Sequence, residues 1–247
     1  MLGLPDAIRG CLFDLDGVLT KTAEVHDAAW TEMFNSFLSE WSRATGAQFV
    51  PFDPVKDYEQ YVDGKPRLDG ARSFLASRGI TLPDGHEGDP PGAHTVYGLG
   101  NRKNQVFLAK IRSEGVEVYE GSVRYVQAAG EAGLHRAVVS SSANTRDILA
   151  AARIEDLFEA RIDGVVAQRE HLHGKPAPDT YLAGARALSL QPDAAAVFED
   201  AQAGVAAGRA GKFGCVVGVD RLGQAAALRE HGADVVVNDL SDLLEQP

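Results

Sequence analysis

Residues 8–20, IRGCLFDLDGVLT, join a short apolar run to two closely spaced aspartates. The run Ile8–Phe13 has the length and composition of a buried strand in a parallel sheet, where apolar and polar residues need not alternate. Asp14 and Asp16 follow at once, and Gly17 permits a turn that can point both carboxylates toward one place. Ligands of open α/β sheets bind beyond the carboxyl ends of strands, so this segment predicts both a strand and a site.

Four further apolar runs alternate with alanine-rich segments of helical length. The runs are Arg136–Val139, Ala194–Phe198, Cys215–Val219 and Asp234–Val237. The expected helices are Ser122–Ala132, Thr145–Arg153, Asp179–Leu188, Gly204–Ala210 and Gln224–His231. Such alternation predicts an α/β fold whose parallel strands are joined by right-handed crossovers.

The long interval between the first and second strands breaks this alternation and is mostly helical. Large apolar residues recur every three or four positions between Thr22 and Thr45, which makes one helix face. Further helices are expected at Val55–Val62, Arg67–Ser77 and Arg102–Arg112, with an exposed loop at Leu82–Gly92. We therefore expect an α/β core, residues 1–21 and 116–247, and an inserted helical domain, residues 22–115.

The composition argues against several classes of partner and location. The 247 residues carry 24 Lys and Arg against 35 Asp and Glu, a net charge of −11. An acidic balance argues against nucleic-acid and anionic-membrane partners, which need a basic face. We expect no membrane span, since the apolar runs are short, and no signal peptide in Met1–Gly10. Cys11 and Cys215 are expected to be buried free thiols, and the protein to be cytoplasmic.

A serine run and a lysine add groups that could bind phosphate to the two aspartates of the first segment. Ser140, Ser141 and Ser142 end the second core strand just before a helix start at Asn144, where hydroxyls and backbone N–H groups suit a phosphate oxygen. Lys175 lies in a loop that two prolines stiffen before the next helix. Alone, a serine cluster is more often an ordinary turn or a helix cap, and a lysine in a loop is usually just solvated.

An acidic pair, Glu199 and Asp200, follows the strand Ala194–Phe198. With Asp14 and Asp16 it supplies carboxylates for a hard cation and one for proton transfer. The hydroxyls and the ammonium are the groups that bind phosphate. Because all of these groups come at strand ends or in the loops beyond them, we expect one common site.

Taken in order, Asp14-x-Asp16-Gly17, Ser140, Lys175 and Glu199-Asp200 resemble the four motifs of the haloacid dehalogenase superfamily. The helical insert is similar to its cap. The resemblance implies a Rossmann-like core, a doubly wound parallel sheet, with an inserted helical cap domain. Four segments look most like the β-phosphoglucomutase branch, which interconverts β-glucose 1-phosphate and glucose 6-phosphate: Asp14–His26, Arg102–Asn104, Lys175–Asp179 and Glu199–Gly204.

The resemblance implies roles for the core residues. Asp14 would be the nucleophile that becomes an aspartyl phosphate, and Asp16 the general acid and base. Mg²⁺ would be held by Asp14, the backbone carbonyl of Asp16 and Asp200, with Glu199 in support. The phosphate-binding residues that it implies are Ser140, Ser141 and Lys175.

The same resemblance implies further substrate and cap residues, namely Gly17, Thr22, His26, Gly64, Lys65, Arg67, Lys103, Ser142 and Asn144. Thr22 and His26 match hinge and proton-relay positions. Gly64 and Arg67 match the cap loop that grips the distal phosphate. The chain departs from the family pattern at Asp63, Gly70 and Ala143, which concerns the specificity for the sugar; Lys65 could compensate for Asp63.

Two alternatives stay open beside the mutase. A phosphatase acting on a small phosphorylated metabolite would share Asp14 and Asp16, but His26, Arg67 and Lys103 favour the mutase because a cap-side cation cluster can hold a second phosphate. A non-catalytic sugar-phosphate binding protein is the alternative of another class, although it would not need the nucleophile. We expect Mg²⁺ as cofactor, a small phosphorylated sugar as partner, and a monomer.

Overall fold

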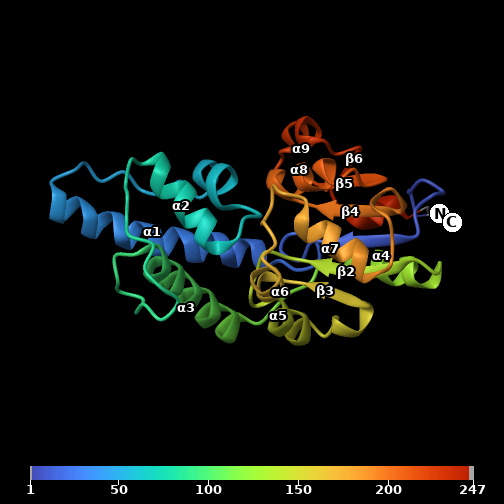
Figure 1. Cartoon of the computed structure of the whole chain (residues 1–247), viewed down its shortest axis with the longest axis horizontal. Coiled ribbons are helices and arrows are strands. Elements are labelled where there is room, and N and C mark those ends of the chain that lie inside the picture. Colours follow the sequence, from blue (N-terminus) through green and yellow to red (C-terminus); the bar gives the residue numbers. More distant parts are fainter. Residues whose placement is uncertain (1, 245–247) are drawn as a thin grey trace. The chain divides into compact units, whose positions relative to one another are not determined.

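The computed structural model describes residues 2–244 (Figure 1). Met1 and residues 245–247, which the expected core range includes, lie outside the described residues. The chain forms two compact units, one of Met1–Thr22 with Val116–Pro247 and the other of Ala23–Gly115. The first contains a parallel sheet with helices, and the second is helical.

The first unit is built on one sheet of six parallel strands in the order β3-β2-β1-β4-β5-β6. The strands are β1 (Gly10–Phe13), β2 (His135–Val139), β3 (Ala160–Ile162), β4 (Ala195–Glu199), β5 (Cys215–Val219) and β6 (Val235–Val237). The five predicted strands are all present. The sequence did not predict β3, because three residues at the sheet edge, with Arg161 in the middle, form no apolar run.

Helices connect these strands. They are α4 (Glu120–Glu131), α5 (Thr145–Ala152), α6 (Gly164–Arg169), α7 (Asp179–Ala187), α8 (Gln202–Ala210) and α9 (Ala225–His231), with 3₁₀ turns at Glu155–Leu157, Pro192–Ala194 and Leu240–Leu243. The five predicted core helices lie within about two residues of their expected ends, the usual ambiguity of helix boundaries. The unpredicted α6 is short and begins where the Asp163 carboxylate accepts hydrogen bonds from the N–H groups of Val165 and Val166.

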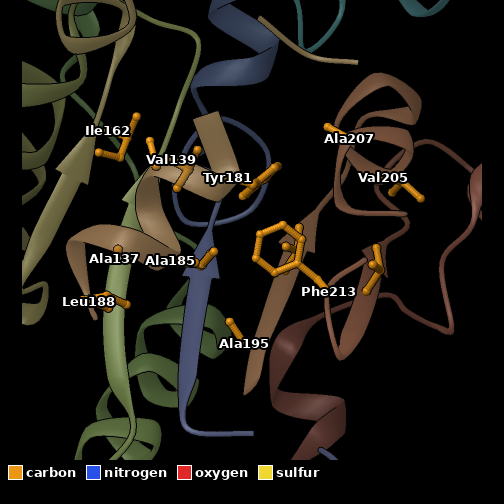
Figure 2. Close-up of a cluster of buried hydrophobic side chains, with 14 of the residues drawn as sticks. Ala137, Val139, Ile162, Tyr181, Ala185, Leu188, Ala195, Val205, Ala207 and Phe213 are labelled. Carbon is orange, nitrogen blue, oxygen red and sulfur yellow. The ribbon is translucent and has the colours of Figure 1, made fainter. Parts of the chain in front are cut away.

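Both faces of the sheet are covered, as β1 shows. Leu12 belongs to the buried cluster that includes Tyr181 of α7 and Val205 of α8 (Figure 2). Phe13 points to the opposite face, where its ring meets that of Tyr125 from α4 with centroids 6.3 Å apart. Successive strand residues face opposite sides, so helices pack on each. This is the expected doubly wound sheet.

The helical unit is held together by an aromatic cluster. Its elements are α1 (Thr22–Thr45), which continues from the first unit, the π-helical turn η1 (Tyr58–Val62), α2 (Arg67–Ser77) and α3 (Val96–Glu114). Phe34 of α1 stacks on Trp30 and Phe52 and contacts Phe74 of α2. Burial of these rings joins the helices because each removes a large apolar area from water. Across residues 2–244, no helix is both long enough and apolar enough to span a membrane.

Helix α3 begins at Val96, six residues earlier than Arg102, where the sequence predicts it. The intervening residues include Gly98 and Gly100, which lower helix propensity and hide the start. Thr95 compensates as the N-cap, because its hydroxyl accepts a hydrogen bond from the Gly98 N–H at 2.9 Å.

We expect Phe34→Ala to lower the free energy of unfolding of the helical unit by about 3–5 kcal/mol, because the substitution leaves a cavity in a fully buried cluster. Both tryptophans of the chain, Trp30 and Trp41, lie in this unit, so their fluorescence in urea reports its unfolding. The control is Phe49→Ala, at a ring that is 45% exposed, with an expected change within about 0.5 kcal/mol. Equal losses for the two variants would contradict the central place of Phe34.

Candidate active site

The candidate site lies at the carboxyl ends of β1 and β4. These strands are neighbours at the point where the strand order reverses, the place where open α/β sheets bind ligands. Asp14 directly follows β1, and its N–H donates a hydrogen bond to the Phe198 carbonyl of β4 at 2.9 Å. Glu199 ends β4 and Asp200 follows. One carboxylate oxygen from each of Asp14, Glu199 and Asp200 lies within 4.8 Å of the other two.

Lys175 enters this acidic cluster from the loop before α7. Its ammonium is 2.5 Å from Asp14 Oδ1, forms an ion pair with Glu199 Oε1, and lies 3.3 Å from the Val139 carbonyl. Only 2% of the residue is exposed. Burial alone would lower the pKa of Lys175, but the two carboxylates raise it above its ordinary value. The lysine therefore stays protonated, and its partners offset the cost of burying the charge.

Glu199 is fully buried, and each of its oxygens has a protein partner. Oε1 accepts from Lys175 and from the Tyr181 hydroxyl at 3.0 Å, and Oε2 accepts from the Ala201 N–H at 3.0 Å. A Cβ at Gly204 would lie 1.8 Å from Oε1, so only glycine leaves room for this carboxylate. The sequence did not single out Tyr181, because a tyrosine inside a helix pattern has the appearance of a core residue. Glu199 thus orients Lys175.

The charges of the cluster are not balanced by the lysine alone. Burial raises the pKa of Asp14 well above its ordinary value, and Glu199 and Asp16 add to this effect while Lys175 opposes it. The cluster contains three carboxylates, and the Lys175 ammonium pairs with two of them, which leaves an excess of negative charge that a further cation would neutralise. Carboxylate oxygens are the donors that hard divalent cations prefer. The cluster of Asp14, Glu199 and Asp200 could therefore bind a metal.

Gly17 allows the aspartate loop to approach Asp200. Its φ is +83°, a conformation that favours glycine. A Cβ at Gly17 would lie 1.7 Å from Asp200 Oδ2, so a side chain would displace the carboxylate. The glycine that the sequence assigns to a turn thus also provides close contact between the two loops.

The Asp16 side chain lies outside the three-carboxylate cluster. Its Oδ1 accepts a hydrogen bond from the Thr22 hydroxyl, and its Oδ2 lies 3.5 Å from Ser140 Oγ. Because the Thr22 hydroxyl proton goes to Asp16, Thr20 donates its own proton to Thr22 Oγ1 at 2.6 Å, and Thr20 Oγ1 also lies 3.2 Å from the Leu15 carbonyl oxygen. A buried chain of hydroxyls therefore orients Asp16. Thr20, which the sequence did not single out, is part of it.

The serine run forms a tight turn into α5. Ser140 Oγ accepts from the Ser142 N–H at 3.1 Å, and Ser142 Oγ accepts from the Asn144 N–H at 3.1 Å. The Thr145 hydroxyl donates to the Ser142 carbonyl at 2.8 Å. Ser141 and Asn144 are half-buried in this turn. Ser140 is thus placed beside β1, since β2 pairs with β1.

Within the helical unit, the structure brings His26 of α1 and Lys103 of α3 together. The Lys103 ammonium donates to His26 Nδ1, and the His26 ring stacks on Phe107 with centroids 4.0 Å apart. The ammonium also lies 5.1 Å from the centre of the Trp30 ring. Aromatic faces attract cations, so this largely buried lysine sits in a favourable pocket of rings.

The predicted cap residues Gly64, Lys65 and Arg67 lie at the turn into α2. Lys65 Nζ donates to Ser73 Oγ at 3.1 Å and to the Gln60 carbonyl at 3.3 Å. Arg67 is the first residue of α2, and burial lowers the pKa of its guanidinium. Lys65 thus contacts its own unit here, while Arg67 carries a partly desolvated positive charge.

The sequence also matches a known protein family. A family model described as haloacid dehalogenase-like hydrolase matches residues 8–212, which include the strand-end residues above. The chain belongs to the haloacid dehalogenase-like hydrolase family. The resemblance predicted from the sequence is therefore confirmed.

Several relatives within the haloacid dehalogenase-like family carry the name β-phosphoglucomutase. Those of Mycobacterium bovis and Mycobacterium tuberculosis are 58% identical over 247 residues, 99% of this chain and 94% of theirs. That of Bacillus subtilis is 31% identical, covering 96% of this chain and 92% of its own. A solved β-phosphoglucomutase from Clostridium difficile has a TM-score of 0.76 at 22% identity, covering 96% of this chain and 93% of its own, and shares the fold.

We expect Lys175→Met to lower the free energy of unfolding of this haloacid dehalogenase-like protein by about 3–5 kcal/mol without divalent cations, because it leaves two buried carboxylates without their cation. Urea unfolding measures the loss. The control is Lys21→Met, which removes an exposed ion pair to Glu117 at 2.8 Å that water already screens. If the two variants lost equal stability, the buried ion pairs would not be what holds the site together.

Proposed function

We propose that this chain is a Mg²⁺-dependent β-phosphoglucomutase, which interconverts β-D-glucose 1-phosphate and D-glucose 6-phosphate through β-glucose 1,6-bisphosphate. The observation that carries the proposal is the buried Asp14 carboxylate, in contact with Lys175 and beside Asp200 at the strand-order reversal. The mycobacterial mutases, 58% identical over nearly the whole chain, support this choice of reaction.

Asp14 is the proposed nucleophile. Its carboxylate oxygen attacks the 1-phosphoryl group of β-glucose 1,6-bisphosphate, the bond between phosphorus and the sugar oxygen breaks, and an aspartyl phosphate and glucose 6-phosphate form. In the second half-reaction the aspartyl phosphate gives its phosphoryl group to the 6-hydroxyl of β-glucose 1-phosphate, which restores the bisphosphate and the free Asp14 carboxylate. Phosphoryl transfer requires mainly positioning and neutralised oxygens. Lys175 and the hydroxyls of Ser140 and Ser141 supply positive charge and hydrogen-bond donors at that place.

Asp16 is the proposed general acid and base. It gives its proton to the leaving sugar oxygen in the first half-reaction and takes a proton from the attacking sugar hydroxyl in the second. The hydrogen bond from Thr22 keeps its carboxyl group apart from the acidic cluster. Thr22 is also where α1 starts, which suits the hinge that the family pattern implies.

The donor set suits Mg²⁺, which Asp14, Asp200 and the backbone carbonyl of Asp16 would hold. Glu199 supports the site by fixing Lys175. When bound, the ion would neutralise phosphoryl oxygens as charge develops on them. Gly17 leaves the space that Asp200 needs to take part.

The helical unit is proposed to act as the cap that excludes water, which a mutase needs in order to keep its bisphosphate from hydrolysis. His26 and Lys103 are proposed to relay a proton and bind substrate, since Lys103 is a buried cation. Arg67 is proposed to grip the distal phosphate. The remaining proposed substrate contacts are Gly64, Lys65, Ser142 and Asn144.

The deciding experiment supplies β-glucose 1-phosphate, Mg²⁺ and a trace of β-glucose 1,6-bisphosphate. We expect glucose 6-phosphate without an equal amount of free phosphate. Stoichiometric phosphate release would instead identify a phosphatase, and tight binding without turnover would identify a sugar-phosphate binding protein.

Asp14→Asn is expected to reduce turnover by roughly 10⁴-fold or more, because an amide cannot form the aspartyl phosphate. Product formation is measured by coupling to glucose 6-phosphate oxidation. The matched control is Asp193→Asn, at an exposed position outside the site, which should retain full activity. Turnover that survived in Asp14→Asn would exclude the aspartyl-phosphate mechanism.

Removing divalent cations with a chelator is expected to abolish turnover, because the cation that would neutralise the phosphoryl oxygens at the three-carboxylate cluster is then removed, and added Mg²⁺ should restore it. The measurement is initial rate against free Mg²⁺ for the wild type and for Asp200→Asn. The variant should need more Mg²⁺ for half-maximal rate. Full activity in metal-free buffer would contradict the assigned metal site.

A further inference from the structure

The loop after β5, residues 220–224, contacts both loops that carry the catalytic carboxylates. Arg221 Nε donates to the Gly17 carbonyl at 2.9 Å, and Gln224 Nε2 donates to the Asp200 carbonyl at 3.1 Å. This loop is itself fixed, because the Asp220 carboxylate accepts from the N–H groups of Gln224 and Ala225 at 2.7 and 3.1 Å. One short segment thus donates hydrogen bonds to the backbone of both loops of the site.

The Arg221 guanidinium also contacts several other groups of the first unit. Its Nη1 donates to the Asn238 carbonyl at 2.6 Å and lies 3.4 Å from Asp239 Oδ2. Its guanidinium lies 3.6 Å from the centre of the Tyr119 ring, and Nη2 is 3.5 Å from Ser122 Oγ. A planar guanidinium can donate these hydrogen bonds and stack on an aromatic ring at the same time, which the ammonium of a lysine cannot do.

Two of these contacts are with the segments of the first unit that lie next to its boundaries with the helical unit. Gly17 lies just before the first connection and Tyr119 just after the second. The two segments pair through backbone hydrogen bonds, Lys21 N–H to the Glu117 carbonyl and Tyr119 N–H to the Leu19 carbonyl, both 2.9 Å. Arg221 therefore contacts both of these segments from the loop after β5.

We propose that Arg221 and Gln224 are positioning residues that set the separation between the Asp14–Gly17 loop and Asp200. Gly17 contacts Asp200 through its backbone, because it has no Cβ. The distance between the Asp14–Gly17 loop and Asp200 therefore depends on how the peptide groups of Gly17 are oriented. The Gly17 N–H donates to the Thr20 carbonyl at 2.8 Å, and its carbonyl is held by Arg221. The peptide bond before Gly17 carries the Asp16 carbonyl assigned to Mg²⁺, so the inference rests on the proposed function.

The test compares Arg221→Met, Arg221→Lys and Gln224→Leu with the control Arg229→Met, whose guanidinium donates to the Ala225 carbonyl of its own helix at 3.4 Å. We expect kcat to fall about tenfold to a hundredfold in Arg221→Met, because a displacement of about 1 Å has effects of this size. KM for β-glucose 1-phosphate should change by less than about threefold. Arg221→Lys, which keeps the charge and loses the fork, should lose most of the same activity.

A second readout does not depend on turnover. Calorimetric titration with Mg²⁺ alone should show weaker binding in Arg221→Met and Gln224→Leu than in the wild type and in Arg229→Met. If Arg221→Met and Arg221→Lys kept the kcat and Mg²⁺ affinity of the wild type and only melted at lower temperature, Arg221 would be merely structural and the proposal overturned. If Arg221→Met does not fold, the Mg²⁺ affinities and kcat values of Arg221→Lys and Gln224→Leu test the proposal.

Absence of mutase activity in the wild type would instead reject the proposed function, while the Mg²⁺ titrations would still test the positioning role.

Discussion

The buried ammonium of Lys175, set between Asp14 and Glu199, is the interaction on which the rest of the site depends. An isolated charge in such a place is costly, and an ion pair offsets that cost only with good geometry and satisfied hydrogen bonds. The structure provides both, since Glu199 also accepts from the Tyr181 hydroxyl and the Ala201 N–H. The excess of carboxylates over ammonium that remains is what makes the cluster suited to a cation. Stability and chemistry therefore share one set of groups.

The sheet topology brings the residues of this site together. The strand order reverses between β1 and β4, the place where open α/β sheets bind ligands, and the loops after these two strands carry Asp14 and Asp200. Gly17 and Gly204 then let two carboxylates approach the backbone more closely than any side chain would permit. Arg221, from the loop after β5, reaches back to the Gly17 carbonyl. Close packing and directional hydrogen bonds thus fix positions that flexible strand-end loops would otherwise leave free.

The fold could be predicted in most of its elements because buried strands and amphipathic helices leave strong local patterns. Elements that depend on tertiary contacts were not predicted. Strand β3 is three residues long and gains its stability from pairing with β2, so its own sequence carries little signal. Helix α3 begins in a glycine-containing segment that becomes helical because Thr95 caps it and its apolar side chains are buried. In each case a tertiary contact or a single cap outweighs intrinsic propensity.

The sequence by itself determined which chemical groups the protein has and that they follow strands, because apolar runs and the polar residues after them are local features. The motifs Asp14-x-Asp16 and Glu199-Asp200 were recognisable for this reason. Only the tertiary structure decided how these groups are paired: that Lys175 contacts Asp14 and Glu199 while Thr22 holds Asp16, and that Tyr181 and Arg221 take part at all. Such contacts join residues far apart in the chain, so their geometry comes from packing around the sheet and has no counterpart in local spacing.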